Sequence, residues 1–213
     1  MKTIAVLLKE IEDADSAPKL ADAVKELAEL GAATMDVAVV PELIRALSYN
    51  NPGAAVAAVD GLIAIGEPSV EPLLVLLDGY NYSARAWGLR ALSGIGDPRS
   101  LSLLLDTAQN DFALSVRRAA ARGLGTIRWD QMAADEVPAA QASVLDVLLG
   151  TLVDGEWVVR YSAISGIERM LSFAQSGETR AAAIESLSEV AQRDEDLAVR
   201  SRASLAIDRS RGN

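Results

Sequence analysis

Arginine and large aromatic residues recur along this sequence at helical spacing, and both can bind a ligand. Indexed at about 100° per residue, several of them point away from the apolar stripe of their predicted helices. A guanidinium group can bind a carboxylate through two hydrogen bonds and can stack on flat conjugated rings. The sequence therefore predicts a basic and aromatic patch, formed by Trp87, Arg90, Arg118, Arg122 and Tyr161.

Two plainer interpretations of this patch stay open. It could be a solvated helix face, or it could be a contact surface for a partner protein. The concave surfaces of repeat proteins commonly bind other proteins, which favours a contact surface for a partner protein over a solvated face.

A second set of arginines has a regular place in the sequence. Each lies about 60° from the centre of a buried stripe, with an acidic residue a few positions earlier. The arginines are Arg85, Arg117, Arg160 and Arg200, and the acidic residues are Asp78, Asp111, Asp154 and Asp196. A feature that returns in every repeat is typical of architecture. We therefore expect a ladder of Asp–Arg pairs that ties adjacent repeats together.

The residues available for catalysis are few, because the sequence has no cysteine and no histidine. Thiolate nucleophiles, imidazole acid–base catalysis, disulfides and Cys/His metal sites are therefore excluded, and no metal centre is expected. Asp60 and Asp111 are weak candidates for a catalytic acid. Helical phase places Asp60 at an exposed position, where a carboxylate more often contributes to solubility than to catalysis.

Charge and hydropathy exclude two further classes of partner. The net charge is −10 at pH 7, which would repel the phosphates of a nucleic acid. No apolar run reaches the roughly 18 residues of a membrane span. The first residues read as an amphipathic helix with acidic residues where a signal peptide would be cleaved. We expect a cytoplasmic protein.

The elements that carry these residues form an internal repeat. Ala58, Gly88, Ala120, Ala163 and Ala203 are equivalent positions, at spacings of 30, 32, 43 and 40 residues. Each lies in a helix rich in small residues that follows a leucine-rich helix. Helix pairs at such spacings indicate an all-α solenoid of the HEAT or armadillo type.

The predicted architecture has about six helix pairs in one elongated, crescent-shaped domain over residues 1–213. Residues 1–34 would form an N-terminal capping pair, and residues 128–141 an insertion between repeats. The second helix of each pair commonly lines the concave wall of such solenoids, so we expect the patch to lie there.

Turn residues mark the predicted helix ends. Asn51 and Pro52 look like an N-cap and a first helical residue. Gly31, Gly66 and Gly96 look like glycines that end helices.

Three longer strings carry a family resemblance. They are "LSYNNPGAAVAAVDGLIAIGEPSVEPLL", "LDGYNYSARAWGLRALSGIGDPRSL" and "DFALSVRRAAARGLGTIRW", and "EWVVRYSAISGIERM" follows them. Together they resemble the F subunit of the heterodimeric E/F-type phycocyanobilin lyases of cyanobacteria, a HEAT-repeat family. The resemblance is weakest in the first 35 or so residues and in residues 128–150.

The resemblance implies a function that needs a partner. In this family the F subunit pairs with a related E subunit. The pair attaches phycocyanobilin through a thioether bond to a cysteine of the phycocyanin α subunit, and it can also detach or transfer the bilin. The bilin is then a substrate, and no tightly bound cofactor is expected. The acceptor thiol belongs to the substrate protein, which agrees with a chain that has no cysteine.

The resemblance also gives the patch a ligand. Arg90, Arg118 and Arg122 would hold the bilin propionates, and Trp87 and Tyr161 would line its rings. The isomerising relatives carry a short motif with histidine and cysteine that has no counterpart here, so simple ligation is favoured. The partner interface is expected at the N-terminal helix pair or at the apolar outward positions Val56, Ala57 and Ala86.

A different class of function remains as an alternative. The chain could be a non-catalytic HEAT adaptor for phycobilisome assembly or degradation. A stand-alone enzyme is disfavoured by the lack of histidine and cysteine.

Overall fold

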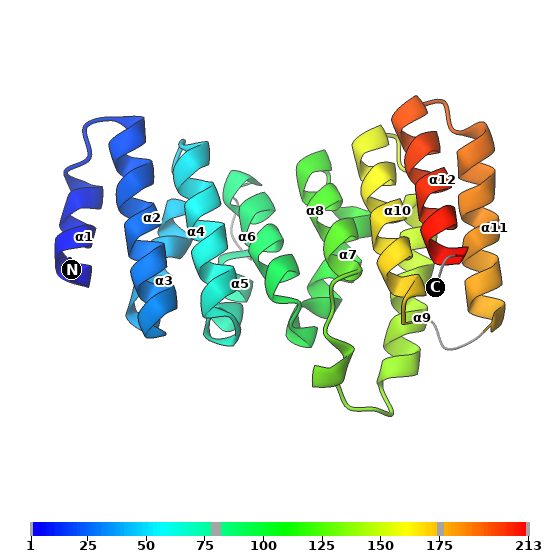
Figure 1. Ribbon diagram of the computed structural model, residues 1–213, viewed down its shortest axis with the longest axis horizontal. Helices are drawn as coiled ribbons and strands as arrows, with labels where there is room; N and C mark the ends of the chain where they lie inside the picture. The colour runs from blue at the N-terminus through cyan, green and yellow to red at the C-terminus, as the bar shows by residue number, and fades with distance from the viewer. Residues whose placement is uncertain (1, 78–81, 174–176, 212–213) are drawn as a thin grey trace. The chain divides into compact units, whose positions relative to one another are not determined.

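The described residues are helical and lie in two units. The computed structural model describes residues 2–77, 82–173 and 177–211, and these contain helices and turns but no strand (Figure 1). The chain divides into unit 1, residues 1–95, and unit 2, residues 96–213. No helix in the described ranges is long and apolar enough to cross a membrane.

Unit 1 contains three helix pairs. Helices α2, α4 and α6 lie side by side, α1 packs on α2, α3 packs on α4, and α5 packs on α6 (Figure 1). The elements are α1 (Ile4–Glu12), α2 (Ala17–Thr34), η1 (Val37–Val39), α3 (Val40–Ala46), α4 (Pro52–Ile65), η2 (Glu67–Ser69), α5 (Val70–Leu77) and α6 (Tyr82–Ile95).

Unit 2 repeats this arrangement. Helices α8, α10 and α12 lie side by side, and α7, α9 and α11 each pack on the helix that follows them. The elements are η3 (Pro98–Ser100), α7 (Leu101–Asn110), α8 (Leu114–Leu124), η4 (Trp129–Gln131), α9 (Val137–Thr151), α10 (Trp157–Leu171), α11 (Gly177–Arg193) and α12 (Leu197–Arg211).

The predicted all-α solenoid is confirmed, with six helix pairs among the described residues. The small residues that set the repeat register lie in the core: Ala58, Ala120, Ala163 and Ala203 are fully buried, and Gly88 is buried as well. A small side chain there lets two helices approach closely. The single domain, the capping role of residues 1–34 and the insertion at 128–141 stay predictions.

The predicted helix ends are confirmed at three positions. Asn51 caps α4 by accepting a hydrogen bond from the Ala54 N–H at 3.1 Å, and Pro52 follows it. Gly66 and Gly96 adopt φ angles of 77° and 72°, in the left-handed region that favours glycine.

The prediction for Gly31 is wrong. Helix α2 continues past it to Thr34, and Met35 ends the helix with a φ of 52°. Gly31 is needed for packing, because a Cβ there would lie 2.3 Å from Cγ2 of Val39.

Two of the predicted edge arginines form buried bridges between successive helix pairs of unit 2. Arg117 Nε donates to Asp154 Oδ2 at 2.7 Å, and Arg160 Nε donates to Asp194 Oδ2 at 2.8 Å. Each arginine also donates to the loop before its own helix: Arg117 Nη1 to Asp111 O at 2.9 Å, and Arg160 Nη1 to Asp154 O at 2.9 Å. The predicted tie between adjacent repeats is therefore confirmed for these two arginines, but the pairing differs: each carboxylate comes from the following helix pair, and the preceding acidic residue accepts through its backbone oxygen.

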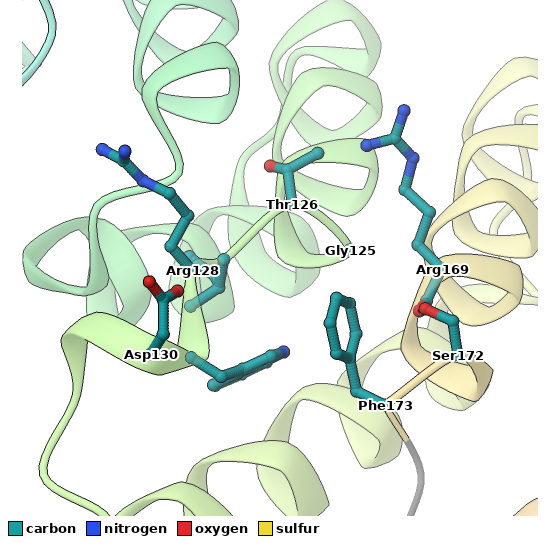
Figure 2. Close-up of a pocket in the computed structure, with 9 residues that line it drawn as sticks. Gly125, Thr126, Arg128, Asp130, Arg169, Ser172 and Phe173 are labelled. Carbon is teal, nitrogen blue, oxygen red and sulfur yellow. The ribbon is translucent and has the colours of Figure 1, made fainter.

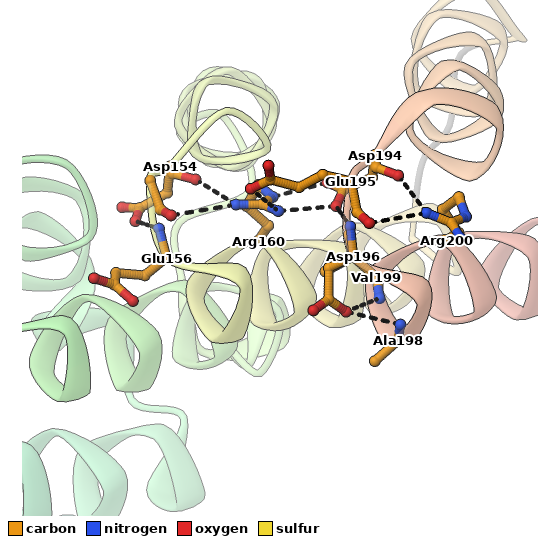
Figure 3. A network of polar contacts seen from close by, with 10 residues as sticks. Asp154, Glu156, Arg160, Asp194, Glu195, Asp196, Ala198, Val199 and Arg200 are labelled. Carbon is orange, nitrogen blue, oxygen red and sulfur yellow. Dashed lines mark hydrogen bonds and ion pairs between the residues drawn. The ribbon is translucent and has the colours of Figure 1, made fainter.

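The ladder differs from its prediction at the last rung (Figure 3). Arg200 Nη1 donates to the backbone carbonyl oxygens of Asp194 at 2.6 Å and of Glu195 at 3.1 Å, and it forms no ion pair with Asp196. Asp196 instead caps α12, where its Oδ1 accepts from the Ala198 N–H at 2.8 Å. Asp78, the predicted partner of Arg85, lies outside the described residues.

The ladder predicts loss of stability in acid. The hydrogen bond from Arg160 holds the pKa of Asp194 below its ordinary value. Burial raises the pKa of Asp154, but hydrogen bonds from Arg117 and from the backbone outweigh it and leave the pKa lowered. A lowered folded-state pKa stabilises the fold above the unfolded value, and this stabilisation is lost as the pH falls through the folded value.

We therefore expect the free energy of unfolding to fall between about pH 5 and pH 1, as urea denaturation at stepped pH would measure. A variant with Arg160→Met and Asp194→Leu together should depend less steeply on pH. An equally steep fall in that variant would contradict an origin in the ladder.

Candidate functional site

In unit 1, the predicted patch residues form a stacked pair. The Cζ of Arg90 lies 5.4 Å from the centroid of the Trp87 ring on the same helix, α6. Trp87 is half-buried and Arg90 is exposed. The pair therefore offers a flat ring with a cation beside it, which suits a conjugated ligand that carries negative charge.

In unit 2, Arg118 and Arg122 lie one turn apart on α8 and are both exposed. Within the described part of the chain, neither side chain makes a hydrogen bond or an ion pair. Both guanidinium groups are thus available to bind an anion.

Tyr161 occupies on α10 the position that Arg118 occupies on α8, and its side chain is 38% exposed. The Cζ of Arg202, from α12, lies 5.8 Å from the centroid of the Tyr161 ring. Arg202 is held in place because its Nε donates to Ser165 Oγ at 3.1 Å and its Nη2 pairs with Glu168. Arg202 was not among the predicted site residues, although it follows the recurring Arg200 by two positions.

The structure brings the unit 2 residues Arg118, Arg122 and Tyr161 together on neighbouring helices, because α8 packs on α10. Trp87 and Arg90 belong to unit 1. One continuous patch across both units stays a prediction.

The two candidate acids differ in their surroundings. Asp60 is exposed on α4. Asp111 ends α7, and its Oδ1 accepts a hydrogen bond from the Ala113 N–H at 2.8 Å. The carboxylate of Asp111 thus has a structural role in the turn that leads into α8.

Unit 2 also contains a pocket that the sequence did not predict. It measures about 520 Å³ and lies where α8 and α10 end, beside η4 (Figure 2). Its lining residues are Gly125, Thr126, Ile127, Arg128, Trp129, Asp130, Arg169, Ser172 and Phe173.

Close packing between the backbones of α8 and α10 determines where this pocket forms. A Cβ on Gly125 would lie 2.8 Å from Cα of Gly166, and one on Gly166 would lie 2.7 Å from the carbonyl oxygen of Ala121. The two glycines therefore let α8 and α10 touch just before the pocket. The Arg128 N–H donates to the carbonyl oxygen of Gly96 at 2.8 Å, which fixes the segment that carries Arg128.

The pocket combines two cations with two aromatic rings. Figure 2 shows Arg128 and Arg169 on opposite sides, with Phe173 between them. The side chains of both arginines are without a hydrogen-bonding or ion-pair partner among the described residues. Trp129 is only 8% exposed, whereas Phe173 is 47% exposed. Helical phase could not indicate this site, because Arg128 and Trp129 lie in the segment that breaks the repeat register.

The fold and the sequence comparisons agree on the class of protein. A model of HEAT repeats matches residues 43–125 and 70–168. The chain is thus a HEAT-repeat protein.

Its relatives are more specific. The chain is 54% identical over 169 residues to phycocyanin alpha phycocyanobilin lyase CpcF of a Synechocystis species, which covers 79% of this chain and 77% of the relative. It is 44% identical to phycocyanobilin lyase subunit beta of Thermosynechococcus vestitus, over 98% of this chain and 97% of the relative. The chain belongs to the family of phycocyanobilin lyase beta subunits, and the resemblance predicted from the sequence is confirmed.

A solved structure is also similar. It is the complex of CpcE and CpcF of phycocyanin lyase from a Nostoc species, which matches with a TM-score of 0.75 and 42% sequence identity. The match covers 80% of this chain and 99% of that chain.

Proposed function

We propose that this chain is the beta, or F-type, subunit of a heterodimeric lyase. With an E-type subunit it attaches phycocyanobilin to a cysteine of the phycocyanin α subunit, and the bilin is its substrate. The observation that carries the proposal is 44% identity to a lyase beta subunit along 98% of this chain. The similar structure of a CpcE–CpcF complex supports the heterodimer.

The reaction is an addition without a leaving group. The sulfur of the substrate cysteine forms a bond to the exocyclic ethylidene carbon of the bilin, and a proton adds to the adjoining ring carbon. This chain has no thiol or imidazole to take part in the addition. Its contribution is to bind and orient the bilin, which lowers the entropic part of the barrier.

The exposed patch is the proposed contact for the bilin. In unit 2, Arg118 and Arg122 bind propionate groups and Tyr161 contacts a ring. In unit 1, Arg90 binds a propionate group and Trp87 contacts a ring. A carboxyl group that assists proton transfer is more easily supplied by Asp60, which is exposed, than by Asp111, whose carboxylate accepts a backbone hydrogen bond.

Co-expression tests the proposed function. The chain, an E-type subunit, the apo α subunit and phycocyanobilin are produced together, and zinc-induced fluorescence of the denatured α subunit reports covalent attachment. We expect a fluorescent adduct that is absent when either lyase subunit is omitted. No adduct above the control without the partner would overturn the proposal, and binding to the biliprotein without attachment would favour an adaptor.

Charge reversal on α8 tests the patch. We expect Arg118→Glu together with Arg122→Glu to weaken bilin binding by the assembled pair about 10- to 100-fold, because charge-assisted hydrogen bonds are lost. Absorbance titration with phycocyanobilin measures the affinity. Arg193→Glu is the matched control, since Arg193 is exposed on α11 and, among the residues that the structure describes, its one ion pair is with Glu189 four residues away. Unchanged binding by the α8 variant would remove these arginines from the bilin site.

A further inference from the structure

We propose that the pocket at the ends of α8 and α10 anchors the carboxylate-bearing part of the bilin. In this proposal, Arg128 and Arg169 bind propionate groups, and Trp129 and Phe173 contact a pyrrole ring. The assignment rests on the proposed function and extends it, because it gives the lyase subunit a half-open binding pocket in addition to the exposed patch.

The charges of the pocket favour an anion. Two arginines line one pocket on a chain whose net charge is −10, and neither forms an ion pair with a carboxylate among the described residues, although the charge of buried Asp97 acts on Arg128. Asp130 also lines the pocket, yet no ion pair joins it to either arginine. Arginine can hold a carboxylate through two parallel hydrogen bonds, so a ligand with two carboxylates matches two such groups.

The apolar part of the pocket favours a flat ligand. Trp129 is almost buried, so its ring is held by the fold. Phe173 is 47% exposed, so its ring is accessible to a ligand. A conjugated ring that enters the pocket would cover it. The volume of about 520 Å³ lies within the range of about 300–1,000 Å³ that is usual for small-molecule sites.

The patch of unit 2 and the pocket are carried by the same two helices, α8 and α10, with the pocket at their C-terminal ends. On α10, Tyr161 and Arg169 are eight residues apart, which is about 12 Å along a helix, and both are exposed. Beyond Arg118 and Arg122, α8 ends at Leu124, and Thr126 in the turn that follows lines the pocket. An open-chain tetrapyrrole carries its propionates on its two central rings, so these rings can lie at the pocket while an outer ring extends along the two helices.

A pair of ligands tests the proposal. The assembled pair of this chain with an E-type subunit is titrated with phycocyanobilin and with its dimethyl ester, in which both propionates are blocked. We expect the ester to bind at least about tenfold more weakly, as the loss of a charge-assisted hydrogen bond implies. Equal affinity for the two ligands would overturn the proposal.

Variants assign the effect to the pocket. Arg128→Gln and Arg169→Gln should each weaken binding of phycocyanobilin about tenfold and leave binding of the ester unchanged. Phe173→Ala should weaken binding of both ligands. Arg193→Gln, which removes an exposed charge from α11, should change neither affinity. If both glutamine variants bind phycocyanobilin as the unaltered pair does, the pocket is not the anchor. If inorganic phosphate displaced bound phycocyanobilin from the assembled pair as effectively as added phycocyanobilin does, the pocket would be a general anion site. That result would also overturn the proposal.

The attachment assay separates failure of the pocket from failure of the function. If the unaltered pair attaches the bilin while the variants bind and attach it equally well, only the pocket assignment fails. If the unaltered pair neither binds nor attaches the bilin, both proposals fail.

Discussion

Replacing Arg160 by methionine is expected to lower the free energy of unfolding of unit 2 by about 3–5 kcal/mol. Arg160 and Asp194 have side chains only 7% and 6% exposed, and two hydrogen bonds of 2.8 Å join them. Removal of the guanidinium leaves the Asp194 carboxylate buried without its ion-pair partner, and only the Asp196 N–H still donates to it. It also leaves the carbonyl oxygen of Asp154 without the donor that now lies 2.9 Å away.

The partner variant distinguishes this cause from simple loss of packing. Arg160→Met together with Asp194→Leu removes both charges, and we expect it to recover most of the lost stability. Urea denaturation followed by circular dichroism measures both variants. For comparison, Arg193→Met breaks an exposed pair and should cost less than about 1 kcal/mol. A loss as small as this for Arg160→Met would contradict a stabilising role for the ladder.

The ladder shows what helical phase can and cannot predict. Phase placed Arg117 and Arg160 at the edge of the buried stripe, because a helix fixes the direction of every side chain relative to its neighbours. It could not choose between Asp194 and Asp196, which lie in the loop before α12. Loop backbone decides which of two nearby carboxylates turns inward, and no periodic pattern records it.

The candidate site also has one part that helical phase predicted and one part that it could not predict. Exposure of Arg118 and Arg122 followed from the repeat register and is found in the structure. The pocket could not be predicted, because it depends on contacts between segments far apart in sequence. One is the contact of Gly125 with Gly166, and another is the hydrogen bond from Arg128 to Gly96.

Gly166→Ala should disrupt the contact between α8 and α10 beside the site. The new Cβ would lie 2.7 Å from the carbonyl oxygen of Ala121 and 2.9 Å from Cδ2 of Leu148. Backbone cannot move aside as a flexible side chain can, so α10 must shift from α8. We expect a loss of about 1–3 kcal/mol in the free energy of unfolding, the usual cost of overpacking a core. Because Arg169 follows on α10, bilin affinity should fall as well.

Gly150→Ala is the matched control, because the same methyl group there meets nothing within 4 Å. Gly150 lies inside α9 and is exposed, so alanine should stabilise the helix by about 0.5–1 kcal/mol through a smaller loss of backbone entropy on folding. The two variants are thus expected to change the urea midpoint in opposite directions. If Gly166→Ala also raised the midpoint, α8 and α10 could not be in backbone contact at Gly166, and the pocket beside them would need another cause.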